Sequence, residues 1–237
     1  MLALITGASR GIGAATARKL AADGCTVLIH CCKQTDLAEA LAAELHGYAF
    51  SADFSDLSQT DSLSETVLSR FGTPDILVNN AAVSVTGLFQ EITDKEAETL
   101  FRVNLFSMMR LTKRLLPGMI RRKSGSIINI ASVWGETGAA CEVHYSVSKA
   151  AVIGFTKALA QEVGPSGIRV NCVSPGVIDT DMNRMHSTET MQQLADETPL
   201  CRIGTPEEAA EAIAFLASER ARFITGQVLS VNGGFYT

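Results

Sequence analysis

Long apolar runs and concentrations of positive charge are both missing from this sequence of 237 residues. No window approaches the roughly 18 uncharged apolar residues of a membrane-spanning helix, so we expect no membrane span. Acidic residues outnumber Lys and Arg by 25 to 20, and this balance argues against nucleic-acid binding. The short basic run Arg121-Arg122-Lys123 is typical of a helix end, where cations suit the helix dipole.

The six cysteines form no C-x-x-C pair, and no Cys/His cluster has the spacing of metal ligands. This pattern predicts free thiols in a reducing compartment and no metal site. The chain also lacks a basic region before its first apolar stretch, so we expect no signal peptide. These absences favour a cytoplasmic protein, and 46% hydrophobic residues suffice for one large core.

Short apolar runs alternate with helical segments from one end of the chain to the other. The runs, each four to six residues long, predict seven strands at 2–6, 26–30, 48–51, 75–78, 126–130, 168–173 and 228–231. Helical patterns occur at 14–22, 36–45, 57–71, 94–116, 145–163 and 206–218. We therefore predict an α/β fold: a single-domain Rossmann-type doubly wound parallel seven-stranded sheet, with helices on both faces, over residues 1–237.

The first strand runs into the glycine-rich stretch Thr6-Gly-Ala-Ser-Arg-Gly-Ile-Gly13, and a helix follows. This is the context that a phosphate-binding loop requires, because the free N–H groups and the dipole of a helix start favour an anion. Gly7 permits the tight turn, Gly11 lets the backbone approach a diphosphate, and Gly13 allows close packing of helix and strand. No Gly-Lys-Ser/Thr follows, which argues against a nucleotide triphosphatase. An ordinary turn between strand and helix is the alternative.

Polar clusters also follow other predicted strands: Asp53-Phe54, Asn79-Asn80-Ala81, Ser132 and Pro175 to Thr180. In open α/β sheets, ligands bind outside the carboxyl ends of the strands. We therefore expect these clusters and the glycine loop to surround one ligand.

Tyr145 and Lys149 lie four positions apart in a predicted helix, which places a phenol beside an ammonium group. A phenol titrates near pH ~10, so it exchanges protons poorly at neutral pH. A neighbouring cation favours the phenolate, and we expect Lys149 to lower the pKa of Tyr145 in this way. A chance polar pair on a helix is the alternative.

Together these motifs point to a known family. The sequence resembles the classical short-chain dehydrogenases/reductases over its whole length, through Thr6-Gly-x-x-x-Gly-x-Gly13, Asn79-Asn80-Ala81, Asn104, Ser132, Tyr145-x-x-x-Lys149 and Pro175-Gly176. Its stretches 175–182, 202–208 and 224–234 are most similar to bacterial 3-oxoacyl-(acyl-carrier-protein) reductases. Ala82 departs from the family's usual glycine, but its methyl group removes no functional atom.

The resemblance implies a catalytic role for four residues. Tyr145 would protonate the carbonyl oxygen during reduction, and Ser132 would hydrogen-bond the same oxygen. Lys149 would lower the pKa of Tyr145 and bind the nicotinamide ribose. Asn104 would hold a water that relays protons from Lys149 to solvent, and a solvent-facing asparagine is the alternative there.

The resemblance also implies a nicotinamide dinucleotide, to which the hydride chemistry belongs. Asp53 and Phe54 would contact the adenine, and Ile178 and Thr180 would meet the carboxamide. The expected cofactor-binding residues are Gly7, Ser9, Arg10, Gly11, Ile12, Gly13, Cys31, Lys33, Asp53, Phe54, Asn79, Ala81, Tyr145, Lys149, Pro175, Gly176, Ile178 and Thr180.

We expect this cofactor to be NADP(H) in preference to NAD(H). An NAD-selecting fold places an acid about 20 residues beyond the glycine loop, where it binds the ribose 2′-OH. Here the thiol of Cys31 stands at that position, and Asp36 better fits the first turn of the next helix. Arg10 could bind a 2′-phosphate bidentately. Lys33 could help, with a solvated surface lysine as the alternative.

We therefore predict an NADP(H)-dependent oxidoreductase that transfers a hydride to or from a carbonyl or secondary alcohol, and that reduces a 3-oxoacyl thioester. The alternative substrates are a sugar acid, a steroid or a small ketone. A non-catalytic dinucleotide sensor is the alternative of another class. Such a sensor would be expected to lose Tyr145 or Lys149, and both are present.

The resemblance further implies a homotetramer, in which the small-residue face of Ala150, Ala151 and Gly154 packs against its copy. An acyl carrier protein could carry the substrate, and the basic run 121–123 or the helix near Arg110 and Arg114 offers positive charge for it.

A substrate lid is expected around residues 180–205, and Met182, Met185 and His186 fall within it. Trp134 is expected either to line the substrate pocket or simply to pack. His144 adjoins Tyr145, but successive helical residues point about 100° apart, so we expect it to face elsewhere.

Overall fold

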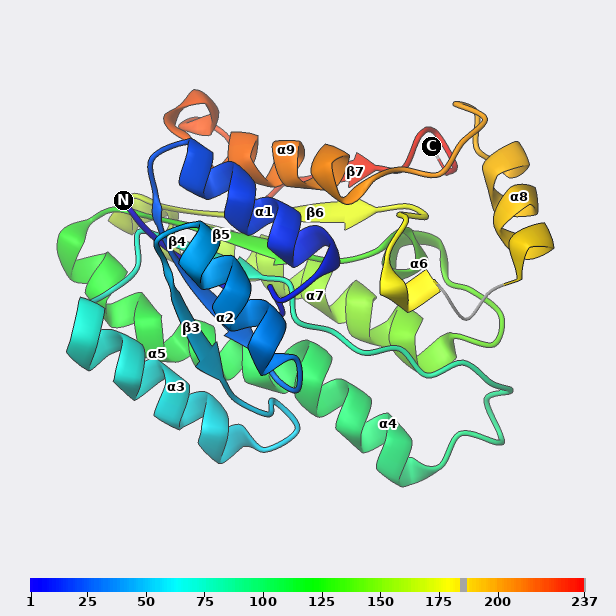
Figure 1. Cartoon of the computed structure of the whole chain (residues 1–237), viewed down its shortest axis with the longest axis horizontal. Coiled ribbons are helices and arrows are strands. Elements are labelled where there is room, and N and C mark those ends of the chain that lie inside the picture. The colour runs from blue at the N-terminus through cyan, green and yellow to red at the C-terminus, as the bar shows by residue number, and fades with distance from the viewer. Residues whose placement is uncertain (184–186, 237) are drawn as a thin grey trace.

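In the computed structural model, which describes residues 1–183 and 187–236, the chain forms one seven-stranded sheet (Figure 1). All its strands are parallel, in the order β3-β2-β1-β4-β5-β6-β7. The strands are β1 Leu2–Ile5, β2 Thr26–Cys31, β3 Tyr48–Ser51, β4 Ile76–Asn79, β5 Gly125–Ile130, β6 Ile168–Pro175 and β7 Val228–Val231. The predicted fold is confirmed, and every strand begins within one residue of its expected position.

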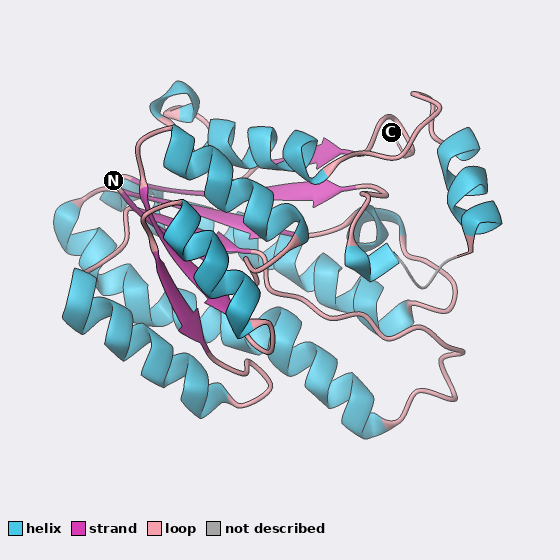
Figure 2. Cartoon of the chain, in the orientation of Figure 1, coloured by secondary structure: helices cyan, strands magenta, loops and turns pink. Residues whose placement is uncertain are grey.

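Helices cover both faces of this sheet (Figure 2). The α-helices are α1 Gly11–Ala22, α2 Thr35–Glu44, α3 Leu57–Phe71, α4 Asp94–Phe101, α5 Ser107–Arg122, α6 Val133–Thr137, α7 Val143–Val163, α8 Thr188–Glu197 and α9 Pro206–Ala217. Short 3-10 turns span Gly164–Ser166, Asp181–Asn183 and Glu219–Ala221. Ala3 and Ile5 of β1 pack in a core with α1, α2 and α9, whereas Leu4 packs with α3, α5 and α7. This alternation of side chains along a strand buries the sheet on both sides.

The order of the strands reverses next to β1. From β1 the chain proceeds outward through β2 to β3, and then returns to β4 on the other side of β1 before proceeding to β7. Such a reversal leaves a crevice at the carboxyl ends of the strands, and ligands bind there.

The long helix predicted at 94–116 is wrong as a single helix. It consists of α4, a π-helical turn at Arg102–Phe106, and α5. A π-helical turn admits one extra residue per turn while the chain continues in the same direction, so apolar periodicity does not reveal it. Asn104 lies in this turn and is buried.

Two further helices were not predicted from the sequence. α6 has five residues, which is too short for a helical period to be recognised. α8 carries three apolar residues, Met191, Leu194 and Ala195, which make too short a stripe to predict a core-facing helix, and none of its residues is buried. Both helices lie beside the crevice rather than within the core (Figure 1).

Candidate functional site

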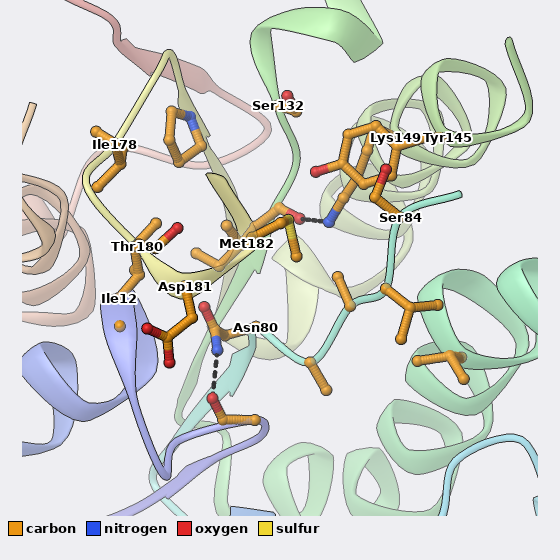
Figure 3. Close-up of a pocket in the computed structure, with 18 of the residues that line it drawn as sticks. Ile12, Asn80, Ser84, Ser132, Tyr145, Lys149, Ile178, Thr180, Asp181 and Met182 are labelled. Carbon is orange, nitrogen blue, oxygen red and sulfur yellow. Dashed lines mark hydrogen bonds between the residues drawn. The ribbon is translucent and has the colours of Figure 1, made fainter. Parts of the chain in front are cut away.

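The carboxyl ends of the strands open into one cavity of about 960 Å³ (Figure 3). Most of the predicted site residues line it: Gly7, Ser9, Arg10, Gly11, Ile12, Cys31, Lys33, Asp53, Phe54, Ala81, Ser132, Tyr145, Lys149, Pro175, Gly176, Ile178 and Thr180. Gly13, Asn79 and Asn104 do not line it, although they were expected in the site. The volume is large enough for a dinucleotide-sized ligand, since ligand pockets measure ~300–1,000 Å³.

Two glycines of the loop after β1 have no room for a side chain. Gly7 has a φ of +63°, and a Cβ there would lie 2.8 Å from the Cα of Ala81. A Cβ at Gly13 would lie 2.5 Å from the carbonyl oxygen of Gly7. α1 begins at Gly11, so its first N–H groups have no partner within the helix. A bare loop ending in free N–H groups fits the diphosphate of a dinucleotide.

Asn80 holds the glycine loop in place. Its Nδ2 donates to the carbonyl oxygens of Thr6 at 2.9 Å and Gly7 at 3.0 Å. The hydroxyl of Thr6 in turn accepts from the N–H groups of Asn80 and Ala81, both at 3.0 Å. The loop after β4 is thereby tied to the loop after β1, and Figure 3 shows Asn80 between them.

Asn79 was expected to contact the cofactor, and the structure does not place it in the cavity. Its Nδ2 donates to Oδ1 of Asn129 on β5 at 2.8 Å and to Oγ1 of Thr112 on α5 at 3.2 Å. Successive residues of a strand point to opposite faces. Asn79 therefore bonds residues of β5 and α5, whereas its neighbour Asn80 reaches the glycine loop.

His30, at the end of β2, is a supporting residue that sequence reasoning missed. Its Nδ1 accepts from the N–H of Gly7 at 3.2 Å, and its Nε2 lies 3.0 Å from the carbonyl oxygen of Ala52, to which it donates. The ring stacks on Phe54 with centroids 4.1 Å apart. Burial lowers the pKa of His30 to about 4, so the ring is neutral and can accept at Nδ1. A histidine ending an otherwise apolar strand was the available signal.

The end of β2, where the adenosine ribose is expected, presents no carboxylate of its own. Cys31, Cys32 and Lys33 line the cavity there. The side chain of Cys31 is buried in the core, so its contribution to a ligand would come from the main chain. Asp36 lies in the first turn of α2, as predicted, and does not line the cavity.

Arg10 of the glycine loop forms an ion pair across the cavity. Its Nη1 lies 3.0 Å from Oδ2 of Asp181, which begins the 3-10 turn after β6. The turn lies close to the loop, because a Cβ at Gly11 would come within 3.3 Å of the Cγ2 of Thr180. Arg10, the residue expected to bind the 2′-phosphate, is therefore paired with a carboxylate in this structure.

Tyr145 and Lys149 of α7 and Ser132 lie together in the cavity (Figure 3). Ser132 caps the amino end of α6, and its hydroxyl accepts from the N–H of Trp134 at 3.3 Å. Nζ of Lys149 donates to the carbonyl oxygen of Ile130 at 2.8 Å and lies 5.6 Å from the centre of the Tyr145 ring. All three side chains are less than 10% exposed, so a reacting group among them is shielded from water.

The expected lowering of the Tyr145 pKa by Lys149 is not found in the structure. Burial raises the pKa of Tyr145 to about 12, and a hydrogen bond with Ser132 opposes this only in part. Burial also lowers the pKa of Lys149 to about 8, because the interior disfavours the charged form of either group. The i, i+4 spacing correctly predicted their proximity but carried no information on their burial. At neutral pH the phenol retains its proton.

Asn104 ties the loop after β4 to the Tyr145 helix instead of facing the cavity. Its Oδ1 accepts from the N–H of Val83 at 2.8 Å, and its Nδ2 donates to the carbonyl oxygen of Val83 at 2.9 Å. The same Nδ2 donates to Oγ of Ser148 at 3.1 Å, and Ser148 donates to the carbonyl oxygen of Tyr145 at 2.7 Å. A relay water at this residue would therefore have to bind its main chain.

Large apolar and aromatic side chains form part of the cavity lining. They are Trp134, Met182, Leu194 of α8 and Tyr236. Trp134 packs edge-on against Phe235 and Tyr236, with ring centres 5.8 and 5.9 Å apart. Trp134 thus both lines the pocket and packs against the C-terminal residues.

The other residues considered for the substrate pocket do not share one location. His144 stacks on Phe89, with ring centres 5.2 Å apart, and does not line the cavity. Met185 and His186 of the expected lid lie outside the described residues. Ser84, which the sequence did not single out, lines the cavity, and its Oγ is buried without a hydrogen-bond partner in the described part of the chain.

Within residues 1–183 and 187–236, no three His, Cys, Asp or Glu side chains come together as metal ligands would. Across the same residues, no helix has both the length and the apolar character needed to cross a bilayer.

Comparison with known proteins places this geometry in context. A family model described as enoyl-(acyl carrier protein) reductase matches residues 7–236. The chain is 44% identical to an uncharacterised oxidoreductase of Bacillus subtilis, over 99% of this chain and 98% of that protein. It is 40% identical to the 3-oxoacyl-[acyl-carrier-protein] reductase of Escherichia coli and 38% identical to that of Staphylococcus aureus, each over 99% of this chain and 97% of the relative.

Proposed function

Because the chain belongs to the short-chain dehydrogenase/reductase family, an oxidoreductase family that uses nicotinamide dinucleotides, we propose that it is an NADP(H)-dependent carbonyl reductase that reduces a 3-oxoacyl thioester. The observation that carries this proposal is the meeting of Tyr145, Ser132 and Lys149 with the glycine loop in one cavity. A dinucleotide bound on that loop would supply the hydride.

The residues of the chain would handle the proton and the developing charge. Tyr145, with a pKa of about 12, is protonated at neutral pH and would donate that proton to the carbonyl oxygen. The hydroxyl of Ser132 would hydrogen-bond the same oxygen and hold it in place. Lys149 would bind the nicotinamide ribose, and the main chain at Asn104 would hold the water that returns a proton from solvent.

The lining of the cavity favours an acyl substrate over a sugar acid. Within the described residues, its cationic side chains are Arg10, Lys33 and Lys149. The first two are expected to bind the cofactor and the third lies in the catalytic group, which leaves no further cationic side chain in the described lining to pair with a substrate carboxylate. An uncharged acyl chain suits a lining that includes Trp134, Leu194 and Tyr236, and the names of the E. coli and S. aureus relatives support a 3-oxoacyl thioester.

We expect the purified protein to oxidise NADPH in the presence of acetoacetyl-coenzyme A. The ketone at C3 would meet Tyr145 and Ser132, and the apolar residues of the cavity lining would contact the rest of the acyl chain. Absorbance at the NADPH maximum measures the rate. Crotonoyl-coenzyme A is the comparison with NADPH, and a sugar acid and a hydroxysteroid are tested in the oxidative direction, with NADP⁺ as the hydride acceptor. Turnover of crotonoyl-coenzyme A alone would favour an enoyl substrate, and turnover of a sugar acid or steroid alone would contradict the thioester assignment.

We expect kcat/KM to be higher for NADPH than for NADH, and the preference to fall by about 10-fold in Arg10→Ala. A charge-assisted hydrogen bond contributes roughly 1.5–3 kcal/mol, or about 10- to 150-fold. The lower value applies because the Arg10 side chain is 55% exposed. Lys33→Ala is the matched control, with a smaller effect. A parent enzyme that uses NADH equally well would contradict this preference.

The proposal includes a homotetrameric assembly and an acyl carrier protein as partner. Ala150 and Gly154 are exposed on α7 and Ala151 is partly exposed, and this face would pack against a second copy in a homotetramer. An acyl carrier protein would deliver the thioester in the cytoplasm. Of the basic residues suggested for it, Arg110 and Arg114 are both paired with Asp61 of α3.

A further inference from the structure

The ion pair between Arg10 and Asp181 joins two loops that flank the cofactor end of the cavity. The two residues are 171 positions apart in the chain, and both line the cavity. Arg10 precedes α1 in an extended conformation, with φ −159° and ψ 175°. Figure 3 shows the Asp181 carboxylate on the side of Thr180 that faces Ile12, so the 3-10 turn Asp181–Asn183 approaches the glycine loop through this acid.

The carboxylate that pairs with Arg10 comes from a different segment of the chain than the expected ribose site. The ribose is expected at the end of β2, whereas Asp181 follows β6. In the sheet order, β2 and β6 stand on opposite sides of β1, which leads into the loop that carries Arg10. In the structure the guanidinium of Arg10 is engaged by this carboxylate, so a 2′-phosphate at the end of β2 would have to replace the carboxylate as its partner.

From this arrangement we propose that Asp181 competes with the cofactor's 2′-phosphate for Arg10, and so sets how strongly the enzyme discriminates NADP(H) from NAD(H). The inference rests on the proposed preference for NADP(H). Asp181 acts through Arg10, as a positioning residue. Each arriving 2′-phosphate displaces a carboxylate from the guanidinium, and part of the attraction for the phosphate is lost in that exchange.

The strengths of the two contacts make the exchange feasible. The side chains of Arg10 and Asp181 are 55% and 26% exposed, and partly exposed pairs of this kind are weak. A phosphate that accepts two parallel N–H bonds from a guanidinium is held more firmly. The phosphate therefore wins the competition, and the carboxylate reduces its advantage without abolishing it.

The test measures binding by calorimetry at low salt, with adenosine 2′,5′-bisphosphate and 5′-AMP as probes that differ by the 2′-phosphate alone. Asp181→Asn keeps the size of the side chain and removes its charge. We expect this variant to bind the bisphosphate about 2- to 5-fold more tightly, the range that exposed ion pairs cover. Its affinity for 5′-AMP should not change. In an Arg10→Ala background, the same substitution should have no effect on either probe.

The matched control is Glu44→Gln, which breaks the exposed Arg18–Glu44 pair away from the cavity. It should change neither affinity. Unaltered or weaker bisphosphate binding by Asp181→Asn would overturn the competition, as would an equal change for both probes, which would indicate a general effect on the lid.

Failure of the cofactor preference gives a different result. If the parent binds both probes equally while Asp181→Asn gains affinity for the bisphosphate, the competition stands and the proposed NADP(H) preference is wrong. If the parent prefers the bisphosphate and Asp181→Asn does not differ from it, the preference stands and the competition is wrong.

Discussion

Replacing Tyr145 by phenylalanine should lower kcat by about 10²- to 10⁴-fold, the usual contribution of a general acid. The ring still fills its buried position, so NADPH affinity should remain close to that of the parent. Only the proton donor is lost. Steady-state rates with acetoacetyl-coenzyme A and the dissociation constant of NADPH, followed by its fluorescence, measure the two effects separately.

Lys149→Ala is the informative comparison, because that side chain is expected to bind the ribose as well. It should weaken NADPH binding and lower kcat together. Removal of a buried amine that donates to the carbonyl oxygen of Ile130 should also reduce stability, so thermal unfolding of both variants must be recorded. A Tyr145→Phe enzyme that keeps most of its kcat would exclude the phenol from the reaction.

Gly13→Ala should be the most damaging single-methyl change in the glycine loop. The new Cβ would lie 2.5 Å from the carbonyl oxygen of Gly7 and 2.8 Å from the Cα of Ala8, so backbone must move. Overpacking of this kind typically costs about 1–3 kcal/mol. The free energy of unfolding in urea measures that loss. NADPH binding should weaken as well, because the shift displaces the loop.

Gly164→Ala provides the control for this prediction. Gly164 ends α7 with a helical φ of −52°, and a Cβ there would meet nothing within 4 Å. Adding a methyl group at such a compatible glycine usually stabilises a protein by about 0.4–1 kcal/mol, through the unfolded chain. If Gly13→Ala unfolded at the same urea concentration as the parent, the tight packing of α1 against the loop would be wrong.

The pattern of residues was sufficient to predict the sheet and the chain segments that surround the site. Apolar runs separated by helices determine a parallel sheet, and the polar groups that follow the runs must then lie at one edge. The two asparagines after β4 show the limit of this reasoning, because Asn79 was predicted to contact the cofactor and the structure places Asn80 beside the glycine loop instead. Both asparagines follow the same run, and a shift of one residue in the end of β4 decides which of them faces the glycine loop.

What the sequence did not show depends on burial and on contacts between distant segments. The raised pKa of Tyr145 is caused mainly by burial, which the spacing of Tyr145 and Lys149 does not reveal. The role of His30 depends on two partners outside its own strand. The π-helical turn that carries Asn104 leaves the helix direction unchanged, so the periodicity of the sequence does not reveal it.

The residues that line the cavity differ in how much substitution they should tolerate. Trp134, Met182, Leu194 and Tyr236 come from α6, a 3-10 turn, α8 and the C-terminal residues, and none of them belongs to the core clusters that surround the sheet. Of these, Met182 and Tyr236 are exposed, and substitutions at exposed positions usually change stability by no more than about 0.5 kcal/mol. Selection for a new substrate could therefore act on these two positions with little loss of stability, whereas side chains at Gly7 and Gly13 would be selected against because neither position has room for one.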